Sequence, residues 1–378
     1  MNNMETPVLL LTGYLGSGKT TLLNRILSNE KGIKFAVIVN DIGEVNIDAT
    51  LIQQGGVVGQ KDDSLVALQN GCICCTLKMD LVQQLSDIVS QHRFDYIVIE
   101  ASGICEPAPI AQSISVYPKM YPNLAKDGVA KLDAIVTVVD ALRLRDEFAE
   151  GNDLTKGNLD EDDLASLVIQ QVEFCNMILL NKADEVSPEE LARIKAILHQ
   201  LQPKAEILPC NYGDVDLDKL LNTHLFDFEK VATSARWIEA VEGDEHDLEN
   251  EDEGEALEYG IGTFVYYRRK PIDMNKFDYI VAKKWPKSVI RCKGLCYFKG
   301  EEDTCYVFEQ AGKQVSLRNA GQWYATMPKD ELEEFKKQNP GILRDWDDTY
   351  GDRMQKLVFI GQDMNREEIE KELDYCLE

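Results

Sequence analysis

Three cysteines fall within four residues of this chain, at Cys72, Cys74 and Cys75. Thiols this close in sequence do not easily close good disulfides with one another, whereas on a looped backbone three sulfurs can converge on one soft cation. Zn²⁺, which thiolate sulfur binds at about 2.3 Å, fits such a set, and Co²⁺ or Cu(I) are alternatives. Inert buried thiols and a redox switch are the other interpretations. Further cysteines are expected to pack or to lie at the surface: Cys105, Cys175, Cys210, Cys292, Cys296 and Cys376.

A glycine-rich segment, residues 13–20, fits the pattern G-x-x-x-x-G-K-[ST] between an apolar run, 8–11, and a helical stretch, 21–27. In such a loop the backbone N–H groups turn toward phosphate oxygens, the lysine reaches the β and γ phosphates, and Thr20 ligates Mg²⁺. An ordinary glycine turn is the alternative. The predicted nucleotide-binding residues are Gly13, Gly16, Ser17, Gly18, Lys19, Thr20 and Thr21.

A second motif, Asn181-Lys182-Ala183-Asp184, follows the apolar run 177–180. An Asp carboxylate accepts two hydrogen bonds from N1–H and the exocyclic amine of guanine, and adenine lacks that pair of donors. We therefore predict GTP or GDP as the nucleotide, with Asn181, Lys182 and Asp184 at the base. A helix-capping loop without a ligand is the alternative.

Two acidic residues are candidates for the hydrolytic step. Glu100 ends the apolar run 96–99 and is expected to hold the Mg²⁺ shell or to orient the attacking water, while the amide of Gly103 senses the γ-phosphate. Residues 40–48 lie where a mobile, phosphate-sensing loop is expected, and Asp48 is its catalytic candidate. The alternative is that both acids are solvated residues at strand ends. Asp140 is interpreted as structural.

A parallel sheet is expected to position these motifs. Short apolar runs rich in β-branched residues alternate with amphipathic stretches, which is typical of β-α-β units. Ligands of open α/β sheets bind outside the carboxyl ends of the strands, so the polar residues that follow these runs should converge on one rim. We predict an α/β fold, a P-loop doubly wound and mostly parallel sheet, for a domain over residues 1–225. Its strands are expected at 8–12, 35–39, 96–99, 134–139 and 177–180.

A second, smaller domain is expected after an acidic run at about residues 239–258, which self-repels and buries nothing. We predict a helix and a flexible acidic linker over 226–258, followed by an α+β, ferredoxin-like domain over 259–378 with a split β-α-β arrangement. Its strands are expected at 261–268, 289–298, 304–309 and 357–360, and its helices at 274–285 and 366–377.

Composition excludes several classes of function. The 378 residues exceed one ordinary domain, and a hydrophobic fraction of 44% can fill real cores. The formal charge of -26 repels phosphate backbones and anionic lipid, which argues against nucleic acid and membrane partners. No apolar run approaches the roughly 20 residues of a membrane span, and residues 1–5 carry no signal region. We expect a cytoplasmic protein with reduced cysteines.

The chain strongly resembles the CobW-like GTPases, the SIMIBI-class P-loop metallochaperones related to the hydrogenase and urease nickel-insertion GTPases. The segments that carry the resemblance are 12–23, 43–45, 70–75, 100–103 and 181–184, with 291–294, 351–353 and 357–361 in the second domain. The resemblance implies GTP hydrolysis coupled to holding a transition metal, most often zinc, at the cysteine motif and handing it to a metal-dependent client protein. A nucleotide-dependent homodimer is one candidate assembly.

Within this resemblance, Glu44 matches an acid of the family that joins the metal shell. Asp41 replaces a more usual Glu, and Val39 stands where some members carry another acid. The linker is acidic, with only His246, where many members have a histidine-rich segment. The alternatives are a metal-binding regulator or buffer with incidental GTPase activity, and delivery of cobalt or iron for cobalamin synthesis or nitrile hydratase activation. A nucleotide kinase or ATPase is a third alternative. Asp184 argues against it, because its carboxylate matches the donors of guanine and not those of adenine.

Overall fold

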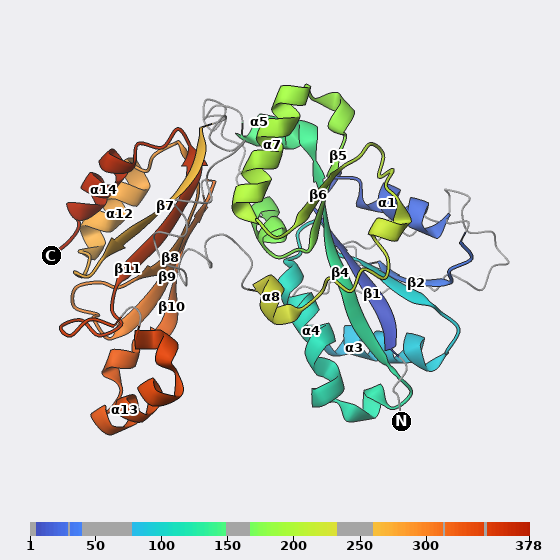
Figure 1. Ribbon diagram of the computed structural model, residues 1–378, viewed down its shortest axis with the longest axis horizontal. Coiled ribbons are helices and arrows are strands. Elements are labelled where there is room, and N and C mark those ends of the chain that lie inside the picture. Colours follow the sequence, from blue (N-terminus) through green and yellow to red (C-terminus); the bar gives the residue numbers. More distant parts are fainter. Residues whose placement is uncertain are drawn as a thin grey trace. The chain divides into compact units, whose positions relative to one another are not determined.

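The computed structural model describes residues 5–28, 31–39, 78–148, 167–232, 260–312, 314–343 and 346–378. The chain divides into two compact units, whose described parts lie within residues 5–232 and 260–378, and each unit is described by itself (Figure 1). The predicted cysteine site, the predicted phosphate-sensing loop and the predicted acidic linker lie outside the described residues.

The first unit contains a six-stranded sheet of order β2-β3-β1-β4-β5-β6, in which all neighbours are parallel. The first five strands confirm the predicted ones, whereas the short, partly exposed β6 was not predicted. The order reverses at β1, since β2 and β3 lie on one side of it and the later strands on the other. Such a reversal opens a ligand crevice at the carboxyl ends of the strands. The strands are β1 Glu5–Thr12, β2 Phe35–Val39, β3 Tyr96–Glu100, β4 Val129–Asp140, β5 Met177–Asn181 and β6 Glu206–Pro209.

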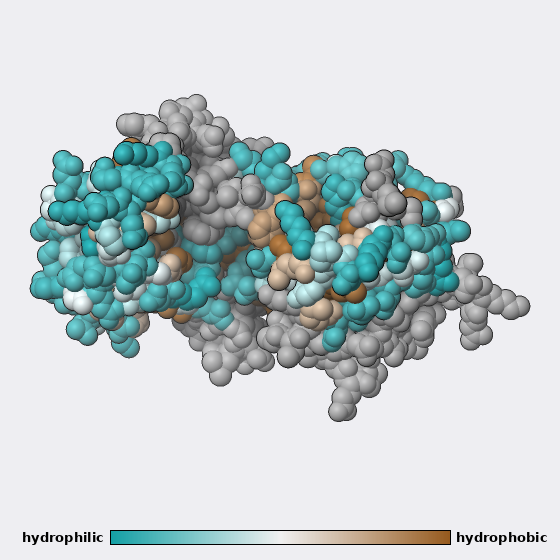
Figure 2. Space-filling model, turned by 90° about the horizontal axis from the view of Figure 1, so that it is seen from below, coloured by the Kyte–Doolittle hydropathy of each residue, from teal (hydrophilic) through white to brown (hydrophobic). Residues whose placement is uncertain are grey.

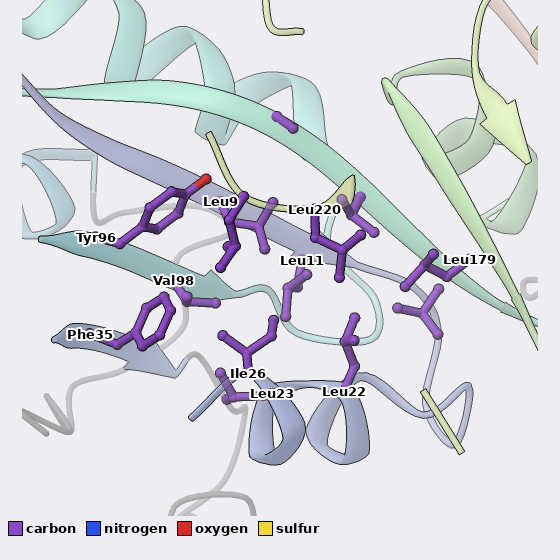
Figure 3. Close-up of a cluster of buried hydrophobic side chains, with 14 of the residues drawn as sticks. Leu9, Leu11, Leu22, Leu23, Ile26, Phe35, Tyr96, Val98, Leu179 and Leu220 are labelled. Carbon is purple, nitrogen blue, oxygen red and sulfur yellow. The ribbon is translucent and has the colours of Figure 1, made fainter. Parts of the chain in front are cut away.

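Helices cover both faces of this sheet. On one face, α1 packs Leu22, Leu23 and Ile26 against Leu9 and Leu11 of β1 (Figure 3). The alternate residues of β1 are buried on the other face, where α4 contacts β1 and β4 and α3 contacts β4. A helix as short as α1 is marginal alone, so its apolar side chains, at about 1.5–3 kcal/mol each, hold it on the sheet. The helices are α1 Lys19–Leu27, α3 Lys78–Ser90, α4 Pro107–Met120, α5 Ala141–Phe148, α7 Pro188–Leu201 and α8 Phe228–Ala232.

The second unit is an antiparallel sheet of order β10-β9-β8-β11-β7. β7 and β8 are joined through α12 and have β11 between them, which is the predicted split β-α-β arrangement. The predicted helices end earlier than expected, and β10 and α13 were not predicted. The elements are β7 Ile261–Arg268, α12 Met274–Lys283, β8 Val289–Cys296, β9 Thr304–Ala311, β10 Gln314–Gln322, α13 Lys329–Gln338, β11 Gln355–Gln362 and α14 Arg366–Asp374. Among the helices of both units' described parts, none is long and apolar enough to cross a membrane.

A charged cluster joins three strands of the second sheet. Glu309 of β9 pairs with Arg291 at 2.6 Å and Lys293 at 3.1 Å, both of β8, and with Arg318 of β10 at 2.8 Å. Burial by itself raises the pKa of Glu309, but the attraction of Arg291 and Lys293 outweighs burial and holds the pKa at about 2. This carboxylate is therefore ionised in the folded protein at neutral pH.

Candidate functional site

Residues 13–18 connect β1 to α1, which begins at Lys19, two residues before the predicted helical stretch 21–27 (Figure 1). Gly13 has φ +131° and Gly18 has φ +110°, both in the left-handed region that favours glycine. A Cβ at Gly13 would lie 2.3 Å from the backbone oxygen of Val138, and a Cβ at Gly18 would lie 2.3 Å from Asn181 Nδ2. Glycine is therefore required at both positions, where the loop backbone lies directly against β4 and β5.

Lys19 and Thr20 turn their side chains toward different parts of the site. Lys19 Nζ donates to the carbonyl oxygens of Gly13 at 2.8 Å and Tyr14 at 3.1 Å, so the ammonium lies over the loop. Thr20 Oγ1 donates to Oε1 of the buried Glu100 at 3.0 Å. The structure thus brings together the predicted magnesium ligand and a predicted catalytic acid. A hydroxyl and a carboxylate supply the oxygen ligands that Mg²⁺ prefers, so this pair fits the ion.

Gly103 lies against the phosphate loop. A Cβ on Gly103 would be 2.7 Å from the backbone nitrogen of Leu15 and 3.2 Å from the carbonyl carbon of Tyr14, so no other residue fits without displacing the loop. Gln171, from the helical segment 167–173, donates through Nε2 to the carbonyl oxygens of Gly103 at 3.4 Å and Cys105 at 3.1 Å. Gln171 was not predicted, and because the contact spans 68 residues, no local sequence pattern indicates it.

Asn181 joins the guanine motif to the phosphate loop. Its Nδ2 donates to the backbone oxygen of Ser17 at 2.9 Å, and its Oδ1 accepts from the backbone nitrogen of Gly213 at 3.1 Å. Asp184 is exposed, and its backbone nitrogen donates to Asn211 Oδ1 at 3.0 Å. The structure therefore places the predicted base-binding residues beside the predicted phosphate-binding residues. The structure also places the segment after β6 at this site, through Asn211 and Gly213, which were not predicted.

Asp140, interpreted from the sequence as structural, contacts both motifs. Its carboxylate pairs with Lys182 and also accepts from the backbone nitrogen of Arg143 at 3.2 Å, at the start of α5. The hydroxyl of Tyr14 accepts from the backbone nitrogen of Asp140 at 3.0 Å. One residue at the end of β4 thus connects the phosphate loop, α5 and the guanine motif. The sequence signal for Asp140 is its position directly after the apolar run 134–139.

The described cysteines are buried thiols. Burial raises the pKa of Cys175 to about 12 and that of Cys210 to about 11, so neither is a thiolate at neutral pH. Cys292 and Cys296 pack inside the second unit, as predicted. Within the described ranges, no group of three or more His, Cys, Asp or Glu side chains is placed to hold a metal ion. The predicted residues outside those ranges are Glu44, Asp48, Cys72, Cys74 and Cys75.

A doubly wound parallel sheet whose first strand leads into a phosphate loop, joined through Asn181 to an Asn-Lys-x-Asp motif, defines a P-loop nucleotide-binding protein. Residues 7–209 match the family described as CobW/HypB/UreG, nucleotide-binding domain, and residues 261–377 match the cobalamin synthesis protein cobW C-terminal domain. The chain belongs to the CobW/HypB/UreG family, which confirms the resemblance noted in its sequence.

Several named relatives align with this chain. The zinc-regulated GTPase metalloprotein activator 1 of Dictyostelium discoideum is 37% identical over 99% of this chain and 80% of its own length. The zinc chaperone CobW of Pseudomonas aeruginosa is 32% identical over 57% of this chain and 60% of its own. The zinc chaperone YjiA of Escherichia coli is 28% identical over 96% of each chain. The similarity to the first and third relatives extends over both units.

Proposed function

We propose that this chain, a GTPase of the CobW/HypB/UreG family, is a metallochaperone that binds zinc through Cys72, Cys74 and Cys75. It hands the metal to a client protein under the control of its bound nucleotide. The observation that carries the proposal is the bridge that Asn181 makes between the phosphate loop and the guanine motif, in a chain that also holds the C-x-C-C segment. The relatives' names, a zinc-regulated GTPase metalloprotein activator and zinc chaperones, support zinc over Co²⁺.

For hydrolysis, we assign the phosphates of GTP to the N-terminus of α1. Lys19 would exchange its bonds to the loop carbonyls for bonds to the β and γ phosphates, and the N–H of Gly103 would sense the γ-phosphate. Thr20 and Glu100 would hold Mg²⁺, which neutralises charge on the phosphates when bound. Glu100 and Asp48 are the candidates for orienting the attacking water.

For the base, we assign guanine to Asp184. The carboxylate of this residue is exposed, and the bond from its backbone nitrogen to Asn211 leaves both carboxylate oxygens available to N1–H and the exocyclic amine. Asn181 and Lys182 set the position of the motif, through Ser17 and Asp140 respectively. A preference for GTP over ATP follows from this donor pattern.

The metal is the cargo, held by Cys72, Cys74 and Cys75 as thiolates. Ligation releases protons, so zinc binding should weaken as pH falls. Glu44 is proposed as a further ligand from the loop 40–48, which also senses the γ-phosphate. Because one loop would serve both sites, zinc affinity and GTP affinity are linked reciprocally. Coupling energies of about 1 to 3 kcal/mol predict zinc affinities that differ by about 5- to 150-fold between the GTP and GDP forms.

A zinc competition titration tests this proposal, with GDP in one arm and a non-hydrolysable GTP analogue in the other. Wild type should show two different zinc affinities, and a variant with all three motif cysteines changed to Ser should lose tight binding while still binding nucleotide. Cys376→Ser, at a buried thiol of the second unit, is the matched control and should behave as wild type. Equal zinc affinities with the two nucleotides would contradict the proposal and would instead indicate a metal buffer with incidental GTPase activity.

Other parts of the proposal remain predictions. They are the identity of the client protein, a cytoplasmic location, a nucleotide-dependent homodimer, and domain boundaries near residues 225 and 258.

A further inference from the structure

The loop after β6, residues 210–214, is tied to the guanine motif. The backbone nitrogen of Gly213 donates to Asn181 Oδ1 at 3.1 Å, and Asn211 Oδ1 accepts from the backbone nitrogen of Asp184 at 3.0 Å. Both bonds reach the motif itself, one at its first residue and one at its last. The loop therefore has a fixed position beside the residues that we assign to guanine.

The same loop also contacts α1. Arg25 donates through Nε to the backbone oxygen of Tyr212 at 2.8 Å and through Nη1 to Asp214 Oδ1 at 2.8 Å. A Cβ on Gly213 would lie 3.0 Å from the Cα of Leu22, so the loop backbone lies directly on the helix. Because α1 begins at the phosphate loop, the loop 210–214 has a set position relative to both the phosphate-binding and the base-binding residues.

Tyr212 has an unusual conformation within this loop. Its φ is +53°, in the left-handed region that bulky residues rarely adopt, and the residue is 70% exposed. Such residues persist where the surroundings hold them, and they gather at ligand-binding sites. A ring this exposed adds little to the core, so folding alone does not account for an aromatic residue here. Exposure alone does not indicate a binding residue, because apolar side chains also reach the surface elsewhere on this unit (Figure 2). At Tyr212 the exposure is combined with a left-handed backbone and with the hydrogen bond between Asp184 and the neighbouring Asn211.

We propose that the ring of Tyr212 packs against the face of the purine of the bound nucleotide, beside Asp184. Hydrogen bonds to Asp184 read only the edge of the base, whereas an aromatic ring covers a face and excludes water from it. Stacking is tolerant of base identity because every base has a π-face. Tyr212 therefore sets the affinity for purine nucleotides, while Asp184 sets the preference for guanine. This inference rests on the proposed nucleotide function and adds a base-packing residue to it.

The test compares the affinities of the whole chain for GDP, IDP, ADP and inorganic tripolyphosphate by calorimetric titration. Tyr212→Asn removes the ring but keeps a residue type that tolerates the left-handed conformation. Tyr212→Phe keeps the ring and removes the hydroxyl. Tyr375→Asn is the control, because this tyrosine of the second unit is similarly exposed, at 67%. Melting temperatures without nucleotide establish that each variant is folded.

We expect Tyr212→Asn to weaken GDP and IDP binding alike by about 5- to 150-fold, since base stacking contributes about 1–3 kcal/mol at 1.4 kcal/mol per tenfold. The ratio of GDP to IDP affinity and the binding of tripolyphosphate should not change. Tyr212→Phe and Tyr375→Asn should bind GDP as wild type does.

Wild-type GDP affinity in a folded Tyr212→Asn variant would overturn this inference and leave the proposed function standing. A loss of tripolyphosphate binding in that variant would also overturn it, because the effect would then reach the phosphate loop rather than the base. A wild-type protein that binds ADP as tightly as GDP would instead contradict the guanine assignment of the proposed function.

Discussion

Two asparagines lie at opposite ends of β5, and the side-chain amide of each joins two other segments. Asn181, at the carboxyl end, bonds Ser17 and Gly213 at 2.9 and 3.1 Å. Asn176, directly before the strand, accepts from the backbone nitrogen of Ile135 at 2.9 Å and donates to the backbone oxygen of Leu225 at 3.1 Å. We predict that Asn181→Ala lowers both stability and GDP affinity, whereas Asn176→Ala lowers stability alone.

The size of each effect follows from burial. Ser17 and Gly213 are buried, so Asn181→Ala leaves one carbonyl and one N–H unsatisfied. At about 1–3 kcal/mol for each such group, the free energy of unfolding should fall by about 2–6 kcal/mol. Leu225 is 44% exposed, so in Asn176→Ala its carbonyl regains water and the loss should be about half as large. Melting temperature should fall by about 2–4 °C per kcal/mol in a unit of this size.

Calorimetric melting with and without GDP separates the two effects. In wild type, GDP at about 100 times its Kd should add about 2.7 kcal/mol of stability. Asn176→Ala should keep the whole of this nucleotide-induced shift, and Asn181→Ala should lose most of it. Equal GDP-induced shifts in the two variants would refute the reasoning, because Asn181 would then support the fold without organising the phosphate loop.

Three further perturbations test other parts of the molecule. Gly18→Ala should abolish GDP binding in a titration, because φ is +110° and the new Cβ would lie 2.3 Å from Asn181 Nδ2. The control is Gly32→Ala, at φ +72° with nothing within 4 Å of its Cβ, which should leave GDP affinity unchanged. Equal losses of GDP affinity in the two variants would contradict this prediction. The pKa of Glu309 is lowered from 4.5 to about 2, so its contribution is present above pH 4.5 and is lost as pH falls toward 2. Urea unfolding at pH 6 and pH 3 should show wild type losing about 2 kcal/mol more than Glu309→Gln, because part of the contribution is still present at pH 3, and the same pH dependence in both would refute the ion-pair argument. Deleting residues 242–255 should leave melting temperature and zinc affinity nearly unchanged, since solvated charges are screened beyond about 8 Å; a large fall in melting temperature would mean that the segment packs.

The sequence alone determined the local parts of the site. The order strand, glycine loop, helix over residues 8–27 follows from a short apolar run, from glycines, which tolerate positive φ, and from a helical stretch. The position of Asp184 after β5 and of Glu100 at the end of β3 follows in the same way. These features depend on neighbours in the chain, so pattern and residue type are enough to predict them.

The tertiary structure decided which of these parts meet. Asn181 and Ser17 are 164 residues apart, and Gln171 and Gly103 are 68 apart, yet each pair is in contact because the sheet places β1 between β3 and β4, and β5 next to β4. β6 was not predicted because it is four residues long and partly exposed, so it lacks the buried apolar run of a central strand. The loop that it leads into, with Tyr212, was therefore missed as well. Strand order is set by the packing of helices on both faces of the sheet, which no single stretch of sequence contains.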